Sequence, residues 1–378
     1  MTHISSHILE IGDDGFELES DNEESHEFTQ EKPFDPRKVD VSINTPNMGA
    51  LIKRLEHGEI DLFPDFQRSK DLWSKQAQSR LIESLLIRLP IPAFYFDAIS
   101  DEKWQVVDGL QRLTAIKNFV IEKKLPLTKL EFLKEYEGCY YDDLPRPLTR
   151  RIDEFQTSVY LIKPGTPLLL KYSLFNRINT GGLKLKPQEM RHALSQSVNK
   201  GAASKFLSGI VNTEIFSQVV GNKNNRMSHE ELALRHMAFK IYGPNEYKSS
   251  LPNFLDLTMN KLGKITEDER NFYKTELLKS LELALHLFGD HAFKKSLIEP
   301  DHKKVVNKPL FDCISVVFSN IRDDHIDTLY ENTESFVSDF RELLLDQNFN
   351  DSISRSTSNT DRVLLRFKEF QKIVDWYL

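Results

Sequence analysis

The stretch Trp104-Gln105-Val106-Val107-Asp108-Gly109-Leu110-Gln111-Arg112-Leu113-Thr114 joins two hydrophobic periodicities. Up to Val107 it suits a buried β-strand, and Ala93 to Asp97 is predicted to be its hairpin partner. Beyond Gly109 the apolar spacing of about 3.6 residues predicts a helix. The residues on one face of that helix are Leu113, Ile116, Phe119 and Val120. The chain is therefore expected to pass from strand to helix at Asp108-Gly109.

This junction is a candidate phosphate site. The N-terminus of a helix offers unpaired N–H groups and a partial positive charge, and a glycine such as Gly109 lets the backbone approach a ligand closely. Arg112 can add a forked pair of hydrogen bonds, and Asp108 can hold Mg²⁺ or orient a water molecule. The same Asp-Gly pair is also typical of an ordinary capped turn.

Two further polar clusters are candidates for the same site. In Phe66-Gln67-Arg68, we expect Gln67 and Arg68 to bind phosphate, although a surface ion pair would also explain the arginine. In the run Phe175-Asn176-Arg177-Ile178-Asn179-Thr180-Gly181-Gly182, the polar residues Asn176, Arg177, Asn179 and Thr180 are the candidates. A helix C-cap with a left-handed glycine is the alternative for this run.

The order of elements predicts an α+β chain. Helices are expected after Thr45-Pro46, after Ser74 and after Lys186-Pro187, and a further strand over Ser158 to Ile162. From about residue 200 the pattern predicts helices almost exclusively. They are expected over Ser228–Tyr242, Asn253–Leu262, Glu267–Phe288, Lys308–Ile321, Ile326–Leu345 and Ser356–Leu378. The predicted division is a disordered acidic leader at 1–40, a nucleotide-binding domain at 41–200 and an all-α domain at 201–378.

The net charge of −7 comes from the leader. Residues 1–35 contain eleven acidic side chains and one lysine, which leaves 46 acidic and 49 basic residues in the rest of the chain. A segment so acidic and so poor in apolar residues is expected to stay disordered. It is either a solubilising tail or an autoinhibitory arm that covers a basic groove.

Composition excludes several classes of protein. The two cysteines, Cys139 and Cys313, form no CxxC pair, which argues against a disulfide framework and suits the cytoplasm. The longest apolar run is far shorter than the roughly 18–20 residues that a membrane span needs, so no membrane association is expected. The P-loop pattern and His-Glu-x-x-His are both absent from the sequence.

Together these clusters resemble the N-terminal domain of GmrS-type subunits of modification-dependent, GmrSD-like type IV restriction systems. The hallmark Asp-Gly-Gln-Gln-Arg motif stands here as Asp108 to Arg112, with Leu110 in place of the first glutamine. The other matching stretches, from about residue 45 to at least 320, are Phe66 to Arg68 with Trp73, Leu81 to Leu86, Leu89 to Pro92, Phe175 to Gly182, Pro187 to Arg191, Arg226 with Glu230 to Arg235, Phe254-Leu255, and Phe288-Gly289 with Ala292-Phe293.

The resemblance implies a ParB/sulfiredoxin-like small mixed sheet with helices, in which the Asp-Gly-x-Gln-Arg turn binds a nucleotide. It implies a nucleoside triphosphate and Mg²⁺ as cofactors, with Asp108, Gln111 and Arg112 as catalytic residues, Asp108 as metal ligand, and Gly109 and Leu110 in the phosphate-binding turn. The Leu110 replacement puts hydrolysis in doubt more than binding.

The resulting prediction is a regulatory subunit of an antiviral DNA defence system that binds and hydrolyses nucleoside triphosphates. Its expected partners are a nucleotide, DNA, a separate nuclease or effector subunit and further copies of itself. Some relatives carry a second, nuclease domain with a His-x-x-Pro-type histidine motif. This motif is missing from the sequence, and Glu299 to His302 does not replace it. The alternative is a non-enzymatic DNA-binding or scaffold protein that holds a backbone phosphate in the same pocket. A sulfiredoxin-like reductase is excluded, because positions 108–112 contain no cysteine.

Overall fold

The computed structural model describes residues 11–12, 15–17, 40–62, 73–100, 102–167, 170–172, 174, 186–195, 201–222, 227–298 and 304–378. The chain forms two compact units. Residues 31–185 make one, here called the sheet unit, and residues 186–378 together with 1–30 make the other, the helical unit. Among the described helices, none combines the length and apolar character needed to cross a membrane.

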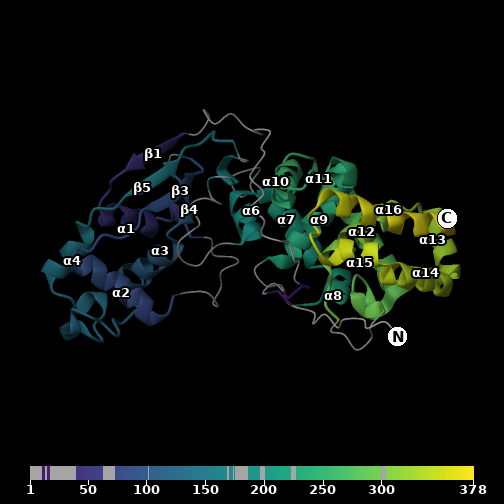
Figure 1. Ribbon diagram of the computed structural model, residues 1–378. Coiled ribbons are helices and arrows are strands. Elements are labelled where there is room, and N and C mark those ends of the chain that lie inside the picture. Colours follow the sequence, from purple (N-terminus) through teal and green to yellow (C-terminus); the bar gives the residue numbers. More distant parts are fainter. Residues whose placement is uncertain are drawn as a thin grey trace. The chain divides into compact units, whose positions relative to one another are not determined.

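Among its described residues, the sheet unit contains five strands, the helices α1 to α4, and helical residues at 170–172 and 174 (Figure 1). In chain order the strands and the helices α1 to α4 are β1 (Val41–Asn44), α1 (Met48–Glu56), β2 (Ile60–Asp61), α2 (Lys75–Leu86), β3 (Phe94–Ala98), β4 (Trp104–Asp108), α3 (Leu110–Ile116), α4 (Arg146–Asp153) and β5 (Val159–Ile162). A π-helical turn (Lys117–Ile121) continues α3, and short 3-10 turns cover Lys134–Tyr136 and Tyr141–Asp143.

The sheet is mixed, with strand order β1-β5-β3-β4-β2. The predicted hairpin of β3 and β4 is confirmed as an antiparallel pair, whereas β3 pairs with β5 in parallel. Figure 1 shows α1, α2, α3 and α4 on one side of this sheet. The layer between contains fully buried side chains, namely Met48, Ile82, Phe94, Phe96, Leu113, Ile116 and Val159.

Local capping explains why the helices of this unit begin where they do. The Ser74 hydroxyl accepts a hydrogen bond from the Ala77 N–H at 3.2 Å, as the sequence predicts for the start of α2. Helix α1, predicted to follow Thr45-Pro46, begins at Met48, and its cap is Asn47, whose side chain accepts from Ala50 N at 2.9 Å. Strand β1 was not predicted, because it is a four-residue edge strand in which Ile43 is exposed.

Glu83 on α2 fixes a loop of the sheet unit. Its buried carboxylate accepts backbone hydrogen bonds from Glu131, Phe132 and Leu133, at 3.0, 2.7 and 2.8 Å. Burial raises the pKa of Glu83, but the hydrogen bonds from these three amides outweigh it and lower the pKa below its ordinary value. The carboxylate therefore takes the place of a secondary-structure partner for three consecutive N–H groups.

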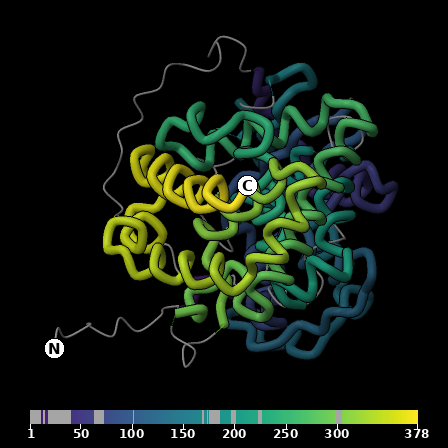
Figure 2. Tube along the Cα trace, turned by 90° about the vertical axis from the view of Figure 1, so that its right-hand side faces the viewer, coloured from purple at the N-terminus to yellow at the C-terminus, as the bar shows by residue number. Residues whose placement is uncertain are grey.

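The helical unit contains no strand element from residue 186 onward in its described part (Figure 2). Its helices are α6 (Pro187–Ser195), α7 (Ala202–Val211), α8 (Glu214–Val220), α9 (Ser228–Tyr242), α10 (Leu251–Leu262), α11 (Glu267–Phe288), α12 (Lys308–Phe318), α13 (Asp323–Glu331), α14 (Thr333–Leu345), α15 (Gln347–Ser354) and α16 (Thr360–Tyr377). Short 3-10 turns cover Pro244–Glu246, Gly289–His291 and Lys295–Leu297. The yellow helix α16 faces the viewer in Figure 2. The predicted mixed sheet followed by an all-helical region is thus confirmed.

The prediction of one continuous helix over Ile326–Leu345 is wrong. The structure breaks it into α13 and α14 at Asn332. The Asn332 side-chain amide donates to the Thr328 carbonyl at 2.8 Å, and so competes with the backbone ladder.

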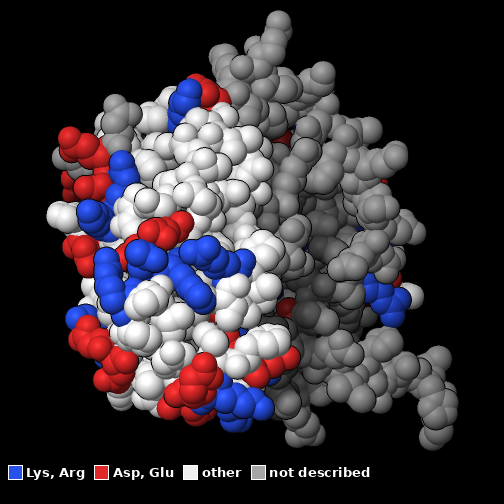
Figure 3. Space-filling view, turned by 90° about the vertical axis from the view of Figure 1, so that its left-hand side faces the viewer, with Lys and Arg blue, Asp and Glu red and all other residues white. Residues whose placement is uncertain are grey.

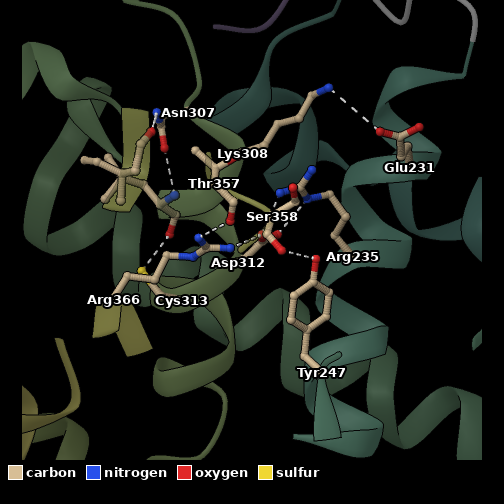
Figure 4. A network of polar contacts seen from close by, with 12 residues as sticks. Glu231, Arg235, Tyr247, Asn307, Lys308, Asp312, Cys313, Thr357, Ser358 and Arg366 are labelled. Atoms are coloured by element: carbon tan, nitrogen blue, oxygen red, sulfur yellow. Dashed lines mark hydrogen bonds and ion pairs between the residues drawn. The ribbon is translucent and has the colours of Figure 1, made fainter. Parts of the chain in front are cut away.

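A buried ion network lies in the core of the helical unit (Figure 4). The Arg235 guanidinium forms two hydrogen bonds with the Asp312 carboxylate, at 2.9 and 2.7 Å, and neither side chain is more than 1% exposed. Arg366 approaches the same carboxylate at 3.5 Å and donates to the Thr357 carbonyl at 2.7 Å. Helices α9, α12 and α16 are thereby joined by charge as well as by apolar packing.

We predict that Glu83→Gln lowers the free energy of unfolding by about 1.5–3 kcal/mol, because the amide retains one acceptor oxygen and turns an NH₂ group toward backbone donors. Urea unfolding followed by circular dichroism measures this. The native pKa of Glu83 is lowered, so its contribution is complete above the unfolded pKa and is lost as the pH falls through the native value.

The matched control is Glu131→Gln, which makes the same change at an exposed position in the same loop. The gap between wild type and Glu83→Gln should close on acidification. Equal stability of the two variants at neutral pH would contradict the role assigned to Glu83.

Candidate functional site

The predicted change from strand to helix is found at Asp108–Gly109. Strand β4 ends at Asp108 and α3 begins at Leu110, with Gly109 between them at φ 101°. Glycine reaches this conformation easily, and here it is also required by space. A Cβ atom on Gly109 would lie 2.5 Å from Cδ1 of the fully buried Phe94. Within the described part of the chain, no side chain caps the start of α3.

A β-bulge directs Asp108 toward a neighbouring tyrosine. The pairing of β3 with β4 shifts between Tyr95 and Phe96, so that Tyr95 lies opposite Asp108 and Phe96 opposite Val106. Side chains directly opposite each other share one face of a sheet. On the other flank, the Tyr95 ring stacks on that of Tyr160, with centroids 4.7 Å apart. The carboxylate therefore lies beside an aromatic pair.

Arg112 lies underneath the turn and is largely buried, at 8% exposed. Its Nη2 donates to Asp108 Oδ2 at 2.7 Å. Its Nη1 donates to the carbonyls of Pro92 and Ala93, the latter at 3.2 Å. The guanidinium also lies over the Phe94 ring, 4.8 Å from its centroid. Both terminal nitrogens of this arginine thus bind acceptors of the protein itself.

Burial makes the charged forms of both Asp108 and Arg112 less favourable. Burial raises the pKa of Asp108, and the Arg112 charge and the Gly109 N–H oppose that rise without cancelling it. Burial likewise lowers the pKa of Arg112 against the opposing effect of Asp108. Burial also raises the pKa of Tyr95, and Tyr160 and Asp108 raise it further. The site thus holds a partly desolvated carboxylate whose ionisation is sensitive to a new charge nearby.

Gln111 connects the turn to the start of α2. The Trp73 N–H donates to Gln111 Oε1 at 3.0 Å, and the Trp73 carbonyl accepts from Gln78 Nε2 at 2.8 Å. Asn118, in the π-helical turn, donates to Gln78 Oε1 at 2.9 Å. This chain of amides fixes the backbone of Trp73, which follows Gln67 and Arg68 in the sequence by six and five positions.

A buried ion pair anchors the segment that precedes the second polar run. Lys171 Nζ donates to both carboxylate oxygens of Asp97 on β3, at 2.6 and 2.8 Å. The lysine is 6% exposed and the aspartate is fully buried. Burial raises the pKa of Asp97, and the Lys171 charge opposes this shift. The pair holds the chain to the sheet four residues before Phe175.

Of the predicted site residues, Asp108, Gly109, Leu110, Gln111 and Arg112 are together in one turn. Gln67, Arg68, Asn176, Arg177, Asn179 and Thr180 lie outside the described residues. Among the described residues, no group of three or more His, Cys, Asp or Glu side chains is arranged to hold a metal ion.

Sequence reasoning missed the residues that support the turn. The Pro92 and Ala93 carbonyls hold Arg112, yet backbone acceptors leave no signature in a sequence. Asp97 and Lys171 are 74 positions apart, so no local pattern joins them. A signal was available for Tyr95 alone, which stands in the middle of a predicted strand next to the motif.

A model of a known protein family matches the part of the chain that contains this turn. Residues 49–195 match the family model described as GmrSD restriction endonuclease, N-terminal domain. This segment is a GmrSD-type N-terminal domain. The resemblance predicted from the motifs is confirmed over residues 49–195, which extend from α1 through α6 and include the Asp108–Arg112 turn. No curated protein and no solved structure gives a significant match.

The geometry of the GmrSD-type domain predicts a high cost for Gly109→Ala. The new Cβ would both strain the backbone and displace Phe94, so we expect a loss of about 2–5 kcal/mol in the free energy of unfolding. Thermal and urea unfolding measure it.

Gly138→Ala is the matched control, because Gly138 also has a positive φ, of 83°, but nothing within 4 Å of the added Cβ. It should cost about 1–2 kcal/mol. If the two variants are equally stable, the close approach of Phe94 to the turn is not a constraint on this site.

Proposed function

We propose that this chain is a nucleotide-binding component of a restriction-type DNA defence system, and that the Asp108–Arg112 turn is its phosphate site. The observation that carries the proposal is the family match over residues 49–195, which includes this turn. We further propose that the sheet unit has a ParB/sulfiredoxin-like fold. DNA and a separate nuclease or effector subunit are the proposed partners of the chain.

The local geometry supports phosphate binding by the backbone. Helix α3 begins without a side-chain cap from any described residue, and its seven residues run on into five π-helical residues. Gly109 contributes no side chain that would block an approaching ligand. The N–H groups of the first turn can therefore face a phosphate oxygen, where the helix dipole favours negative charge.

The contacts of Arg112 refine its proposed role. Since both terminal nitrogens are bonded to Asp108, Pro92 and Ala93, the arginine positions the turn and supplies positive charge from beneath it. Direct contact with phosphate then belongs to Arg68 and Arg177, as the sequence predicts. Arg68 is five positions from Trp73, whose N–H bonds Gln111, so chain length alone keeps its Cα within about 18 Å of Trp73.

Asp108 is the residue that would hold Mg²⁺. Its side chain is 22% exposed, and a single carboxylate suits Mg²⁺, which takes its remaining ligands from phosphates and water. Bound there, the ion would neutralise charge on the phosphates. The half-buried Asp108 carboxyl, with its raised pKa, would ionise more readily beside a cation, so metal and proton are expected to compete.

Surface charge favours a nucleotide over duplex DNA as the direct ligand of the sheet unit. Figure 3 shows basic side chains on one face of this unit interspersed with acidic ones. Arg146 lies 3.5 Å from Asp153, and Arg150 and Arg88 lie 3.7 and 4.0 Å from Glu154. Extended DNA binding usually requires a face of one sign.

We expect Asp108→Asn to weaken Mg²⁺-dependent nucleotide binding at least tenfold, because losing one charge-assisted interaction removes about 1.5–3 kcal/mol. Calorimetry with the four ribonucleoside triphosphates and Mg²⁺ measures binding, and a phosphate-release assay measures hydrolysis. Asp142→Asn, an identical change at an exposed carboxylate paired with Lys123, should leave both unchanged.

Release by the wild type that disappears in Asp108→Asn would establish a hydrolase. Binding without release would establish a nucleotide sensor and point to Leu110 as the reason. If the wild type binds no nucleotide, the proposed site is wrong. DNA binding that falls steeply with salt would then favour the scaffold alternative.

A further inference from the structure

A short N-terminal piece of the chain packs into the helical unit. Residues 11–12 lie against residues 15–17, with Ile11 bridged to Glu17 and the Gly12 N–H donating to the Phe16 carbonyl at 2.9 Å. Phe16 is 3% exposed within the hydrophobic core of that unit. The centroid of the Phe16 ring lies 5.8 Å from that of His229 and 5.5 Å from the Lys308 ammonium. An acidic leader therefore contains one deeply buried aromatic residue.

Glu17, the next residue, is held at three points. Its N–H donates to the Val306 carbonyl at 3.1 Å. One carboxylate oxygen accepts from Lys295 Nζ and the other from Asn307 Nδ2, the latter at 3.0 Å. The Glu17 and Lys295 side chains are only 11% and 15% exposed, so this ion pair is shielded from solvent more than most surface pairs.

The residues that hold Glu17 are fixed by contacts within the helical unit. Asn307 Oδ1 accepts from Leu310 N at 2.9 Å as the cap of α12, and Asn307 Nδ2 donates to the Ile353 carbonyl at 2.8 Å. Lys295 Nζ also donates to Ser354 Oγ at 2.7 Å. These bonds leave one amide hydrogen of Asn307 for Glu17, so the carboxylate position is preorganised.

The aromatic position is preorganised in the same way. Lys308 pairs with Glu231 at 3.8 Å, which keeps the ammonium near the ring position (Figure 4). The His229 ring also lies 5.8 Å from Phe216, itself fully buried. Burial lowers the pKa of His229, so a neutral imidazole contacts the ring.

We propose that the helical unit carries a peptide-binding site for an aromatic residue followed by a carboxylate, and that Phe16–Glu17 of the chain itself fills it as an exchangeable ligand. The site recognises three features of its ligand: an aromatic ring between His229 and Lys308, a carboxylate between Lys295 and Asn307, and a backbone N–H that donates to the Val306 carbonyl. Acidity alone does not satisfy it. The proposal is independent of the phosphate site.

The test uses a fluorescein-labelled peptide of residues 9–20 and fluorescence anisotropy. The full-length Phe16→Ala/Glu17→Ala protein has an open site and should bind the peptide saturably. The wild type should bind it at least tenfold more weakly, because its own segment competes at an effective concentration near the millimolar range. A peptide carrying the same two substitutions keeps the other acidic residues and should bind neither protein.

Lys295→Met in the double variant should weaken peptide binding at least tenfold by removing the cation. Since the loss of Phe16 could destabilise the core, full-length Glu17→Gln provides a second open-site protein that keeps the buried ring. It should bind the peptide more tightly than the wild type. No saturable binding to either variant, or equal binding of the substituted peptide, would overturn the proposal.

Discussion

The sheet unit depends on the buried guanidinium of Arg112. A buried guanidinium is stable only where the surrounding chain supplies acceptors for its N–H groups. The acceptors are the Asp108 carboxylate and the carbonyls of Pro92 and Ala93. These groups stand at the end of β4 and just before β3, so one side chain sets where two neighbouring strands start and stop. Phe94, over which the guanidinium lies, then leaves room only for a glycine at the turn.

The same solution recurs elsewhere in the chain. Lys171 with Asp97, Arg191 with Asp256, and Arg235 with Asp312 are each buried pairs of opposite charge. Such pairs add little net stability, but removing one partner is costly because the other is left buried without compensation. Each therefore specifies which distant segments must meet: β3 with the chain after β5, α6 with α10, and α9 with α12.

Helices and strands were predictable from the sequence, because their apolar residues repeat at a short, regular spacing. Contacts between residues far apart in the chain were not, because no such repeat marks them. The ranges of α9 and α11, from Ser228 and from Glu267, were predicted to the residue, because long amphipathic helices repeat their signal many times. The Asp108–Gly109 turn was predictable because two periods meet there. The partners of Arg112, in contrast, are backbone carbonyls, which any residue supplies. The burial of Phe16 was hidden because the acidic composition around it predicts disorder for the whole leader.

The packing of Phe16–Glu17 in the helical unit also affects the conformational entropy that the sheet unit gains when it unfolds. The helical unit contains chain from both sides of residues 31–185, and Glu17 is bonded to Val306 and Asn307. While that contact lasts, an unfolded sheet unit is a closed loop rather than a free chain. Loop closure removes conformational entropy from the unfolded ensemble, by up to about 5 kcal/mol for a permanent link around a loop of this length. A two-residue contact in one unit can in this way stabilise the other without touching it, for as long as the contact outlives the unfolding event.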